Sequence, residues 1–251
     1  MDNTEVIILA QGPNRLGARH ELPALQRLIK CGDTTIIWRT VRQVRSIGDG
    51  WWPTVVTWDH VRAAFAFDSG LACHELVEPG NSALKGIARY LELREQQGRR
   101  YTRTIVLLGD VVYSWDCLSA IWRMADAWGF VGTNSLSLEG GELWGVAWHR
   151  AHEDRMLGAL RDALLRHPLG DEYHPAQLRR WISGMNRGDM RDHVRRLERI
   201  GSYVSIDDYT HDIDTVMHLV MLPELSKEAA TDDARHGILW NYTKEGQMKG
   251  L

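Results

Sequence analysis

Residues 6–9, Val-Ile-Ile-Leu, form an uninterrupted apolar run close to the start of the chain. A run of this kind predicts a strand that is buried on both faces, as strands in a parallel sheet are. A polar loop that contains Gly12, Pro13 and Gly17 follows this strand directly. Since parallel strands need a crossover connection, usually a helix, the opening of the chain predicts an α/β fold.

Strand-like and helix-like patterns alternate through the first 150 residues, which strengthens this interpretation. Further strands are expected at residues 54–57, 76–77, 104–108, 130–132, 144–148 and 203–206. Helices are expected at residues 35–46, 81–97, 115–127 and 214–222. The pattern predicts a single α/β domain over residues 1–222, Rossmann-like, with a mainly parallel central sheet. Residues 223–251 are polar and are expected to form a C-terminal tail that is loosely ordered or packs on a partner.

The charge balance limits the classes of partner. The 33 acidic and 30 basic side chains give a formal net charge of -3. This balance argues against a chain that mainly coats nucleic acid or an acidic membrane. The Arg-rich segment 179–199 still leaves a nucleic acid or another anionic ligand open. In the same way, Trp51 and Trp52 leave a contact in a homo-oligomer open.

No apolar run in the chain approaches the roughly 20 residues that span a bilayer. The acidic start, Met-Asp-Asn-Thr-Glu, lacks the basic residues and the long apolar core of a signal peptide. The three cysteines, Cys31, Cys73 and Cys117, are far apart and form no CxxC pair, so reduced thiols are expected. These features predict a cytoplasmic protein without a membrane segment.

Three segments combine the expected end of a strand with polar or glycine residues. In mainly parallel α/β sheets, ligands bind outside the carboxyl ends of the strands. The first segment, residues 9–17, reads Leu-Ala-Gln-Gly-Pro-Asn-Arg-Leu-Gly. Its backbone amides can turn toward phosphate oxygens, and Arg15 can add a bidentate, charge-assisted contact. Neither GxGxxG nor the P-loop motif is present, so an ordinary strand-to-helix turn with a surface arginine stays an alternative.

The second and third segments carry carboxylates. Asp110 follows Gly109 at the end of the strand expected at residues 104–108, where an acid can hold a divalent cation beside a phosphate. Residues 207–214 hold four aspartates, which repel one another unless cations, donors or water separate them. A Mg²⁺ site explains both segments. The alternative for the second segment is a helix or turn cap, and for the third it is a solvated acidic loop in which one aspartate caps the next helix. No histidine metal site is expected, because the chain lacks HxH and HExxH spacings.

The order of these segments resembles that of the sugar-phosphate and alcohol-phosphate nucleotidyltransferases, which have a GT-A-like fold. Residues 7–17 are similar to the LAAGxGxRLG opening of that family, and residues 22–25 stand where the family has a Pro-Lys pair. Residues 78–84, Glu-Pro-Gly-Asn-Ser-Ala-Leu, resemble its nucleobase-reading segment. Residues 108–112 look like its Gly-Asp metal motif, and residues 212–215 are similar to its IDTPEDL segment. The resemblance covers almost the whole chain.

The resemblance implies a Mg²⁺-dependent nucleotidyltransferase. Such an enzyme moves a nucleoside monophosphate unit from a nucleoside triphosphate to a sugar phosphate or an alcohol phosphate, and it releases pyrophosphate. By resemblance, the catalytic residues are Arg15, Asp110 and Asp214. Arg15 contacts the leaving phosphates, and the two aspartates hold Mg²⁺. Asp212 is a further candidate ligand of the metal.

The resemblance also implies where the two substrates bind. The implied nucleotide-binding residues are Leu9, Ala10, Gln11, Gly12, Asn14, Arg15, Asn81, Ser82 and Gly109. Within that set, Asn81 and Ser82 contact the base. The phosphorylated small-molecule acceptor binds to a smaller portion of the domain, formed mostly by residues 139–200.

Two departures from the family pattern keep other functions open. Ala24 replaces the lysine that the family carries after Pro23, and Gln11 and Pro13 alter the glycine-rich loop. Pro13 removes an amide donor, and the loss of a phosphate-binding lysine can cost several kcal/mol in the transition state. One alternative is a GT-A glycosyltransferase with a nucleotide-sugar donor, from which no pyrophosphate leaves. The other is a catalytically inactive nucleotide-binding relative.

Overall fold

Two parallel strands, β1 (Thr4–Leu9) and β6 (Arg103–Leu108), lie at the centre of the fold. The structure is a computed structural model that describes residues 3–10, 30–31, 34–47, 53–57, 72–75, 83–133, 142–166, 190–213 and 216–238. All six residues of β1 are buried, as expected of a strand that is covered on both faces. The strand predicted at residues 6–9 is therefore confirmed, and it begins two residues earlier, at Thr4.

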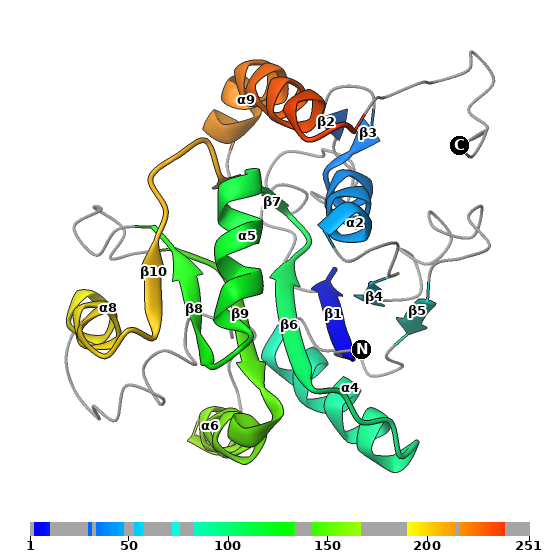
Figure 1. The fold of residues 1–251 in the computed structure, drawn as a ribbon, viewed down its shortest axis with the longest axis vertical. Coiled ribbons are helices and arrows are strands. Elements are labelled where there is room, and N and C mark those ends of the chain that lie inside the picture. The colour runs from blue at the N-terminus through cyan, green and yellow to red at the C-terminus, as the bar shows by residue number, and fades with distance from the viewer. Residues whose placement is uncertain are drawn as a thin grey trace.

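Five further strands complete a seven-stranded sheet in the order β10-β8-β9-β6-β1-β4-β5 (Figure 1). They are β4 (Thr54–Thr57), β5 (Ala72–Glu75), β8 (Trp128–Gly132), β9 (Leu143–His149) and β10 (Tyr203–Ser205). Within this sheet β9 runs antiparallel to its neighbours β6 and β8, and the other four pairings are parallel. The central sheet is therefore mainly parallel, as the alternating pattern predicted.

Helices cover the sheet (Figure 1). They are α2 (Ile36–Ile47), α4 (Ala83–Gln96), α5 (Trp115–Met124), α6 (Glu153–Arg166) and α8 (Met190–Arg199). α5 packs on β8 and β9, α4 packs on β1 and β4, and α6 packs on β9 and on α4. α8 packs on β10, and α2 contacts α5. This cover explains the unbroken apolar runs of the central strands, at residues 6–9 of β1 and 105–108 of β6.

Two small antiparallel pairs lie outside the main sheet. β7 (Val111–Val112) pairs with β11 (His211–Asp212), and β2 (Lys30–Cys31) pairs with β3 (Thr34–Thr35). The β7–β11 pair joins two segments that are about a hundred residues apart in the sequence. Among the described residues, no helix has the length and apolar character that crossing a bilayer requires.

Two expected elements differ from the observed ones in the first half of the chain. α5 ends at Met124 rather than at residue 127, because a turn follows it and β8 begins at Trp128. The strand expected at residues 76–77 lies outside the described residues, and the strand that the structure shows in this region is β5 at Ala72–Glu75. The sequence of β5, Ala-Cys-His-Glu, has neither an apolar run nor β-branched residues, so its pattern does not indicate a strand.

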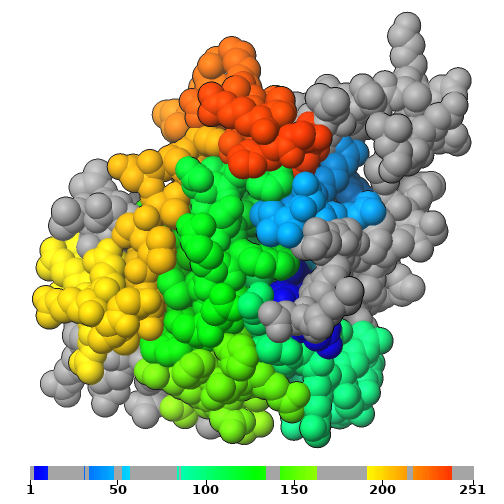
Figure 2. Space-filling view, viewed as in Figure 1, coloured from blue at the N-terminus to red at the C-terminus, as the bar shows by residue number. Residues whose placement is uncertain are grey.

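The largest difference concerns the C-terminal part. α9 (Val216–Arg235) continues through Pro223, where the sequence predicted a helix end at residue 222 and a tail from residue 223. Asp233, near the end of α9, is buried and accepts hydrogen bonds of 2.9 and 2.8 Å from the Arg39 guanidinium of α2. Figure 2 shows the red end of α9 lying against α5 in green and α2 in blue. For residues 223–235 the prediction of a loose tail was therefore wrong.

Candidate functional site

The carboxyl ends of β1 and β6 meet through backbone contacts. The Gly109 N–H donates to the Leu9 carbonyl at 2.9 Å, and the Ala10 N–H donates to the Val56 carbonyl at 2.8 Å. Leu9, Ala10 and Gly109, which the sequence predicted to bind nucleotide, therefore lie together at this edge of the sheet. We call the edge formed by Leu9, Ala10, Gly109 and Asp110 the carboxyl edge. Ligand sites of mainly parallel sheets are found at such edges.

Gly109 is held so closely that only glycine fits without a shift of the backbone. A Cβ atom at this position would lie 2.8 Å from the Leu9 carbonyl oxygen and 3.4 Å from the Ala10 Cα. The first of these distances is shorter than real Cβ contacts allow, and the obstructing atoms belong to the backbone. The glycine therefore lets the ends of β1 and β6 approach each other, with the following residue, Asp110, at the exit of β6.

Asp110 lies next to the acidic segment from the far end of the chain. It is half-buried in the turn between β6 and β7. The register of β7 and β11 pairs Val111 with Asp212, and the Ile213 N–H donates to the Asp110 carbonyl at 3.0 Å. The structure therefore brings the Gly-Asp motif and the start of the Asp-Ile-Asp-Thr segment side by side. Asp214 itself lies outside the described residues.

A buried tyrosine fixes the turn that carries Asp110. The Tyr113 hydroxyl accepts from the Leu108 N–H at 2.7 Å and donates to the Trp144 carbonyl at 2.6 Å. The side chain is fully buried, and this burial raises the pKa of Tyr113 well above its usual value. The hydroxyl is therefore neutral at physiological pH and acts as a permanent bridge between β6 and β9.

One aspartate of the acidic segment serves local structure. The Ser114 hydroxyl donates to the Asp208 carboxylate, and the Thr210 N–H donates to the Asp208 Oδ1 at 2.7 Å. The Ser114 N–H in turn donates to the Thr210 hydroxyl at 3.0 Å. These bonds tie the segment to the start of α5. Asp208 therefore has a structural role in the contact between this segment and Ser114, the N-cap residue of α5.

Asp212 has a different environment, which the sequence analysis missed. Its Oδ1 lies 3.4 Å from the His211 Nδ1 and 3.9 Å from the His218 Nδ1. All three side chains are largely buried, with exposed fractions of 25% for His211, 16% for Asp212 and 14% for His218. The two histidines belong to no recognised spacing, because His211 lies in β11 and His218 lies in α9. In the sequence, the indication of this cluster is the position of His211 within the acidic segment.

The remaining predicted site residues lie outside the described part of the chain. These residues are Gln11, Gly12, Asn14, Arg15, Asn81, Ser82 and Asp214, together with Ala24. The structure does show that α4 begins at Ala83. The helix expected after the Asn-Ser pair is therefore present, and the roles of the pair itself stay predictions.

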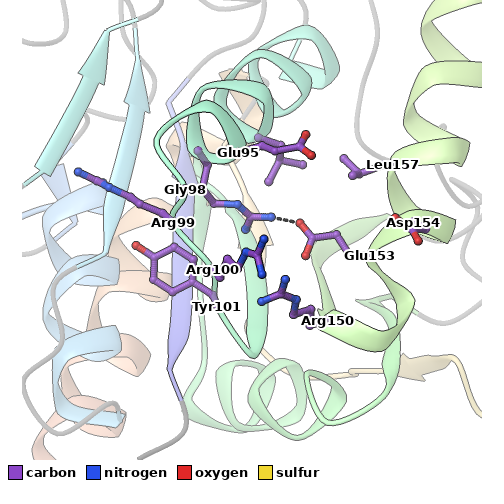
Figure 3. A pocket seen from close by; sticks show the side chains of 11 residues that line it. Glu95, Gly98, Arg99, Arg100, Tyr101, Arg150, Glu153, Asp154 and Leu157 are labelled. Atoms are coloured by element: carbon purple, nitrogen blue, oxygen red, sulfur yellow. Dashed lines mark hydrogen bonds and ion pairs between the residues drawn. The ribbon is translucent and has the colours of Figure 1, made fainter.

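A pocket of about 320 Å³ lies at the opposite end of the central strands (Figure 3). It is lined by the end of α4, residues 98–101 and the start of α6. In it, the buried Arg94 donates to Glu5 at 2.7 Å and also to Glu153. The Thr102 N–H donates to the Asn3 carbonyl just before β1 begins, so this is the amino end of β1 and β6. The pocket is thus separate from the carboxyl edge.

Comparisons with known proteins match no family, whereas solved structures with a similar fold are found. No family model matches the chain, and no curated protein matches it. A protein of Bacillus anthracis assigned as a glucose-1-phosphate thymidylyltransferase, crystallised with sucrose, is 15% identical, with a TM-score of 0.54 over 90% of this chain and 96% of that one. A 4-diphosphocytidyl-2C-methyl-D-erythritol synthase is 12% identical, with a TM-score of 0.51 over 90% of this chain and 98% of that one. The predicted α/β class, Rossmann-like and GT-A-like, is thereby confirmed.

Proposed function

We propose that the chain is a nucleotidyltransferase. It would join a nucleoside monophosphate unit from a nucleoside triphosphate to a sugar phosphate or an alcohol phosphate, with release of pyrophosphate. The observation that carries the proposal is the meeting of the Leu9 and Gly109 backbones and of Asp110 with the Ile213 N–H at one edge of the sheet. The two similar structures, a protein assigned as a glucose-1-phosphate thymidylyltransferase and a 4-diphosphocytidyl-2C-methyl-D-erythritol synthase, support the same reaction class.

Mg²⁺ fits the residues at the carboxyl edge. Asp110 and Asp214 would hold it, and Mg²⁺ prefers carboxylate oxygens together with substrate phosphates. The hydrogen bond from the Ile213 N–H to the Asp110 carbonyl supports this pairing, because it sets the two aspartate-bearing segments side by side. When bound, the ion would supply positive charge that offsets the charge of the phosphates.

The proposed reaction needs positioning more than proton transfer. A phosphate oxygen of the acceptor forms a bond to the α-phosphorus, and the bond from the α-phosphorus to the oxygen that bridges to the β-phosphate breaks. The electron pair of that bond leaves with pyrophosphate. No strong general base is required, since the attacking oxygen is already an anion. The chain would bind the leaving phosphates with loop amides and Arg15, and the base with Asn81 and Ser82.

Glycosyl transfer is the second candidate. Ala24 stands where the resembled family has a lysine that neutralises phosphate charge, and a reaction that releases no pyrophosphate has less need of that charge. The third candidate, which Ala24 also fits, is a relative that binds nucleotide without turnover. Ligand binding separates the first two candidates, because they use different nucleotides.

Thermal denaturation with ligands tests the proposal. A ligand at a hundred times its Kd stabilises the native state by about 2.7 kcal/mol, or roughly 5 to 10 °C for a chain of this size. We expect one of the four common nucleoside triphosphates to raise the Tm selectively in the presence of Mg²⁺. The Mg²⁺-dependent part of the shift should be lost in Asp110→Asn and kept in Asp116→Asn, a matched control whose residue is exposed in the first turn of α5. Stabilisation by nucleotide-sugars alone, or an unchanged shift in Asp110→Asn, would overturn it.

A further inference from the structure

The strongest unassigned cluster of metal-ligating atoms in the described part of the chain is formed by His211, Asp212 and His218. His211 and Asp212 form β11, and His218 lies in the first turn of α9. One nitrogen of each histidine and one oxygen of Asp212 all lie within 4.8 Å of one another. The two imidazole rings are 4.3 Å apart between centroids. Three potential ligands from two elements therefore converge on one point.

One carboxylate oxygen of this cluster, the Asp212 Oδ1, is buried without a hydrogen-bond donor. Its distances to the His211 Nδ1 and the His218 Nδ1, 3.4 and 3.9 Å, fit charge contacts and exceed those of good hydrogen bonds. A buried, unpaired carboxylate oxygen is costly unless a cation lies beside it. The cluster is therefore one that a bound cation would stabilise.

The donor set selects the kind of cation. Two imidazole nitrogens and one carboxylate oxygen suit Zn²⁺ and its neighbours Co²⁺ and Ni²⁺, whereas Mg²⁺ prefers oxygen ligands. With ligand bonds of about 2.1 Å, two ligand atoms of a tetrahedral centre are about 3.4 Å apart. The separation of the His211 and Asp212 atoms, 3.4 Å, already has this value. The His218 nitrogen needs to move closer, which a rotation of its side chain at the start of α9 can supply.

We propose that His211, Asp212 and His218 bind one divalent transition-metal ion of the Zn²⁺ class. This proposal assigns Asp212, a candidate Mg²⁺ ligand by resemblance, to a second ion, and it leaves Asp110 and Asp214 to Mg²⁺. It does not depend on the proposed nucleotidyl transfer. With three protein ligands, the ion keeps a coordination position for water or for an oxygen anion. The ion would also link β11, which is paired with β7 directly after Asp110, to α9. The site thus lies next to the carboxyl edge.

Metal titration of the full chain, without a histidine tag and after treatment with a chelator, tests this proposal. Calorimetry with Zn²⁺ and absorption spectroscopy with Co²⁺ should show one ion per chain at micromolar affinity or tighter. His211→Ala, His218→Ala and Asp212→Asn should each weaken binding by at least about tenfold. Asp110→Asn should bind Zn²⁺ as the original chain does, which separates this site from the Mg²⁺ pair.

His236→Ala is the matched control. His236 lies in the turn directly after α9 and stacks on Trp115. Its Nε2 lies 3.8 Å from the Asp232 Oδ1. Like His211 and His218, it therefore contacts an aromatic ring and a carboxylate, but away from the cluster. Melting without metal shows whether each variant is folded, and Zn²⁺ should then raise the Tm of the His236→Ala chain and leave that of His218→Ala unchanged. The proposal is overturned if the original chain binds neither Zn²⁺ nor Co²⁺. It is equally overturned if a His211→Ala, His218→Ala double variant binds them unchanged.

Discussion

At the scale of single residues, Gly109 shows how one backbone contact restricts the residue type at the candidate site. A Cβ at this position would meet the Leu9 carbonyl oxygen at 2.8 Å. We expect Gly109→Ala to push β1 and β6 apart at the carboxyl edge and to cost about 1–3 kcal/mol of unfolding free energy. Chemical denaturation measures this cost, and triphosphate binding should weaken in parallel.

Gly158→Ala is the matched control for that substitution. Gly158 lies inside α6, and a Cβ there would meet nothing within 4 Å. Alanine is the better helix former, so this variant should gain about 0.5–1 kcal/mol. If both substitutions had the same effect, the close approach of Leu9 to Gly109 would not be the reason for the glycine.

Tyr113 leads to a prediction about alkaline pH. Burial raises the pKa of Tyr113 above its unfolded value of about 10. The stability that follows from this shift is fully present below pH 10 and is lost as the pH rises, because the unfolded chain then releases the proton first. The free energy of unfolding should therefore fall above pH 10, by up to about 1.4 kcal/mol per pH unit from this group.

Tyr113→Phe separates the effect of Tyr113 on stability at alkaline pH from the effects of the other buried hydroxyls and thiols. The variant loses the bonds to Leu108 and Trp144, so it should be less stable at pH 7 by about 0.5–1.5 kcal/mol per bond. Its stability should decline less steeply than that of the original chain above pH 10. Denaturation curves recorded from pH 7 to pH 11 show both effects, and equal slopes would contradict the assignment.

The sequence could indicate Gly109 and Asp110 because a buried strand ends in front of them, and strand ends are readable from local pattern. It could not indicate His218. That residue lies in α9, and its approach to Asp212 of β11 follows no spacing rule. For the same reason Asp208 could not be told apart from Asp212, since only the contacts with Ser114 and Thr210 identify the structural role of Asp208.

At the scale of elements, the C-terminal half of α9 is held by a buried ion pair. Asp233 accepts from Arg39 and also from the Trp115 Nε1–H, at 3.0 Å. Asp233→Ala would leave the Arg39 charge buried without its carboxylate, which typically costs about 3–5 kcal/mol. Chemical denaturation followed by tryptophan fluorescence should show this loss, because Trp115 lies in the same contact.

An exposed pair in the same helix serves as the comparison. Lys227 and Glu224 lie 2.7 Å apart, with 72% and 74% of their side chains exposed. Because solvent screens such a pair, Glu224→Ala should cost less than about 1 kcal/mol. Comparable losses in the Asp233 and Glu224 variants would show that α9 does not depend on its contact with α2.

The end of α9 could not be predicted, because local signals point the other way. Pro223 lacks an amide hydrogen and usually ends or kinks a helix, and a polar stretch follows it. The helix nevertheless continues because Asp233 finds its partner in α2, almost two hundred residues earlier in the chain. By contrast, β1, β6 and β9 were predictable, since their apolar runs reflect burial within the sheet.

At the scale of the whole molecule, the alternation of strands and helices was sufficient to predict a mainly parallel sheet. The alternation could not show that β9 is inserted antiparallel between β6 and β8. Because β9 runs antiparallel to β6, its last residue lies beside the first residue of β6, and the start of α6 and the pocket lie at this end. Asp110 and β11 lie at the other end of β6. Because the carboxyl edge and the pocket are separate, ligands that bind at the carboxyl edge should leave the contacts of Arg94 unchanged.

Pyrophosphate release tests the central claim most directly. The full chain is incubated with Mg²⁺, each common nucleoside triphosphate and a panel of sugar and alcohol phosphates, and the coupled product is identified by mass. We expect one pair to yield pyrophosphate and an equal amount of nucleotide-linked product. Asp110→Asn should lower the rate at least about a hundredfold, and Asp116→Asn should leave it unchanged. Equal rates in Asp110→Asn, or glycosyl transfer from a nucleotide-sugar without pyrophosphate, would contradict the account.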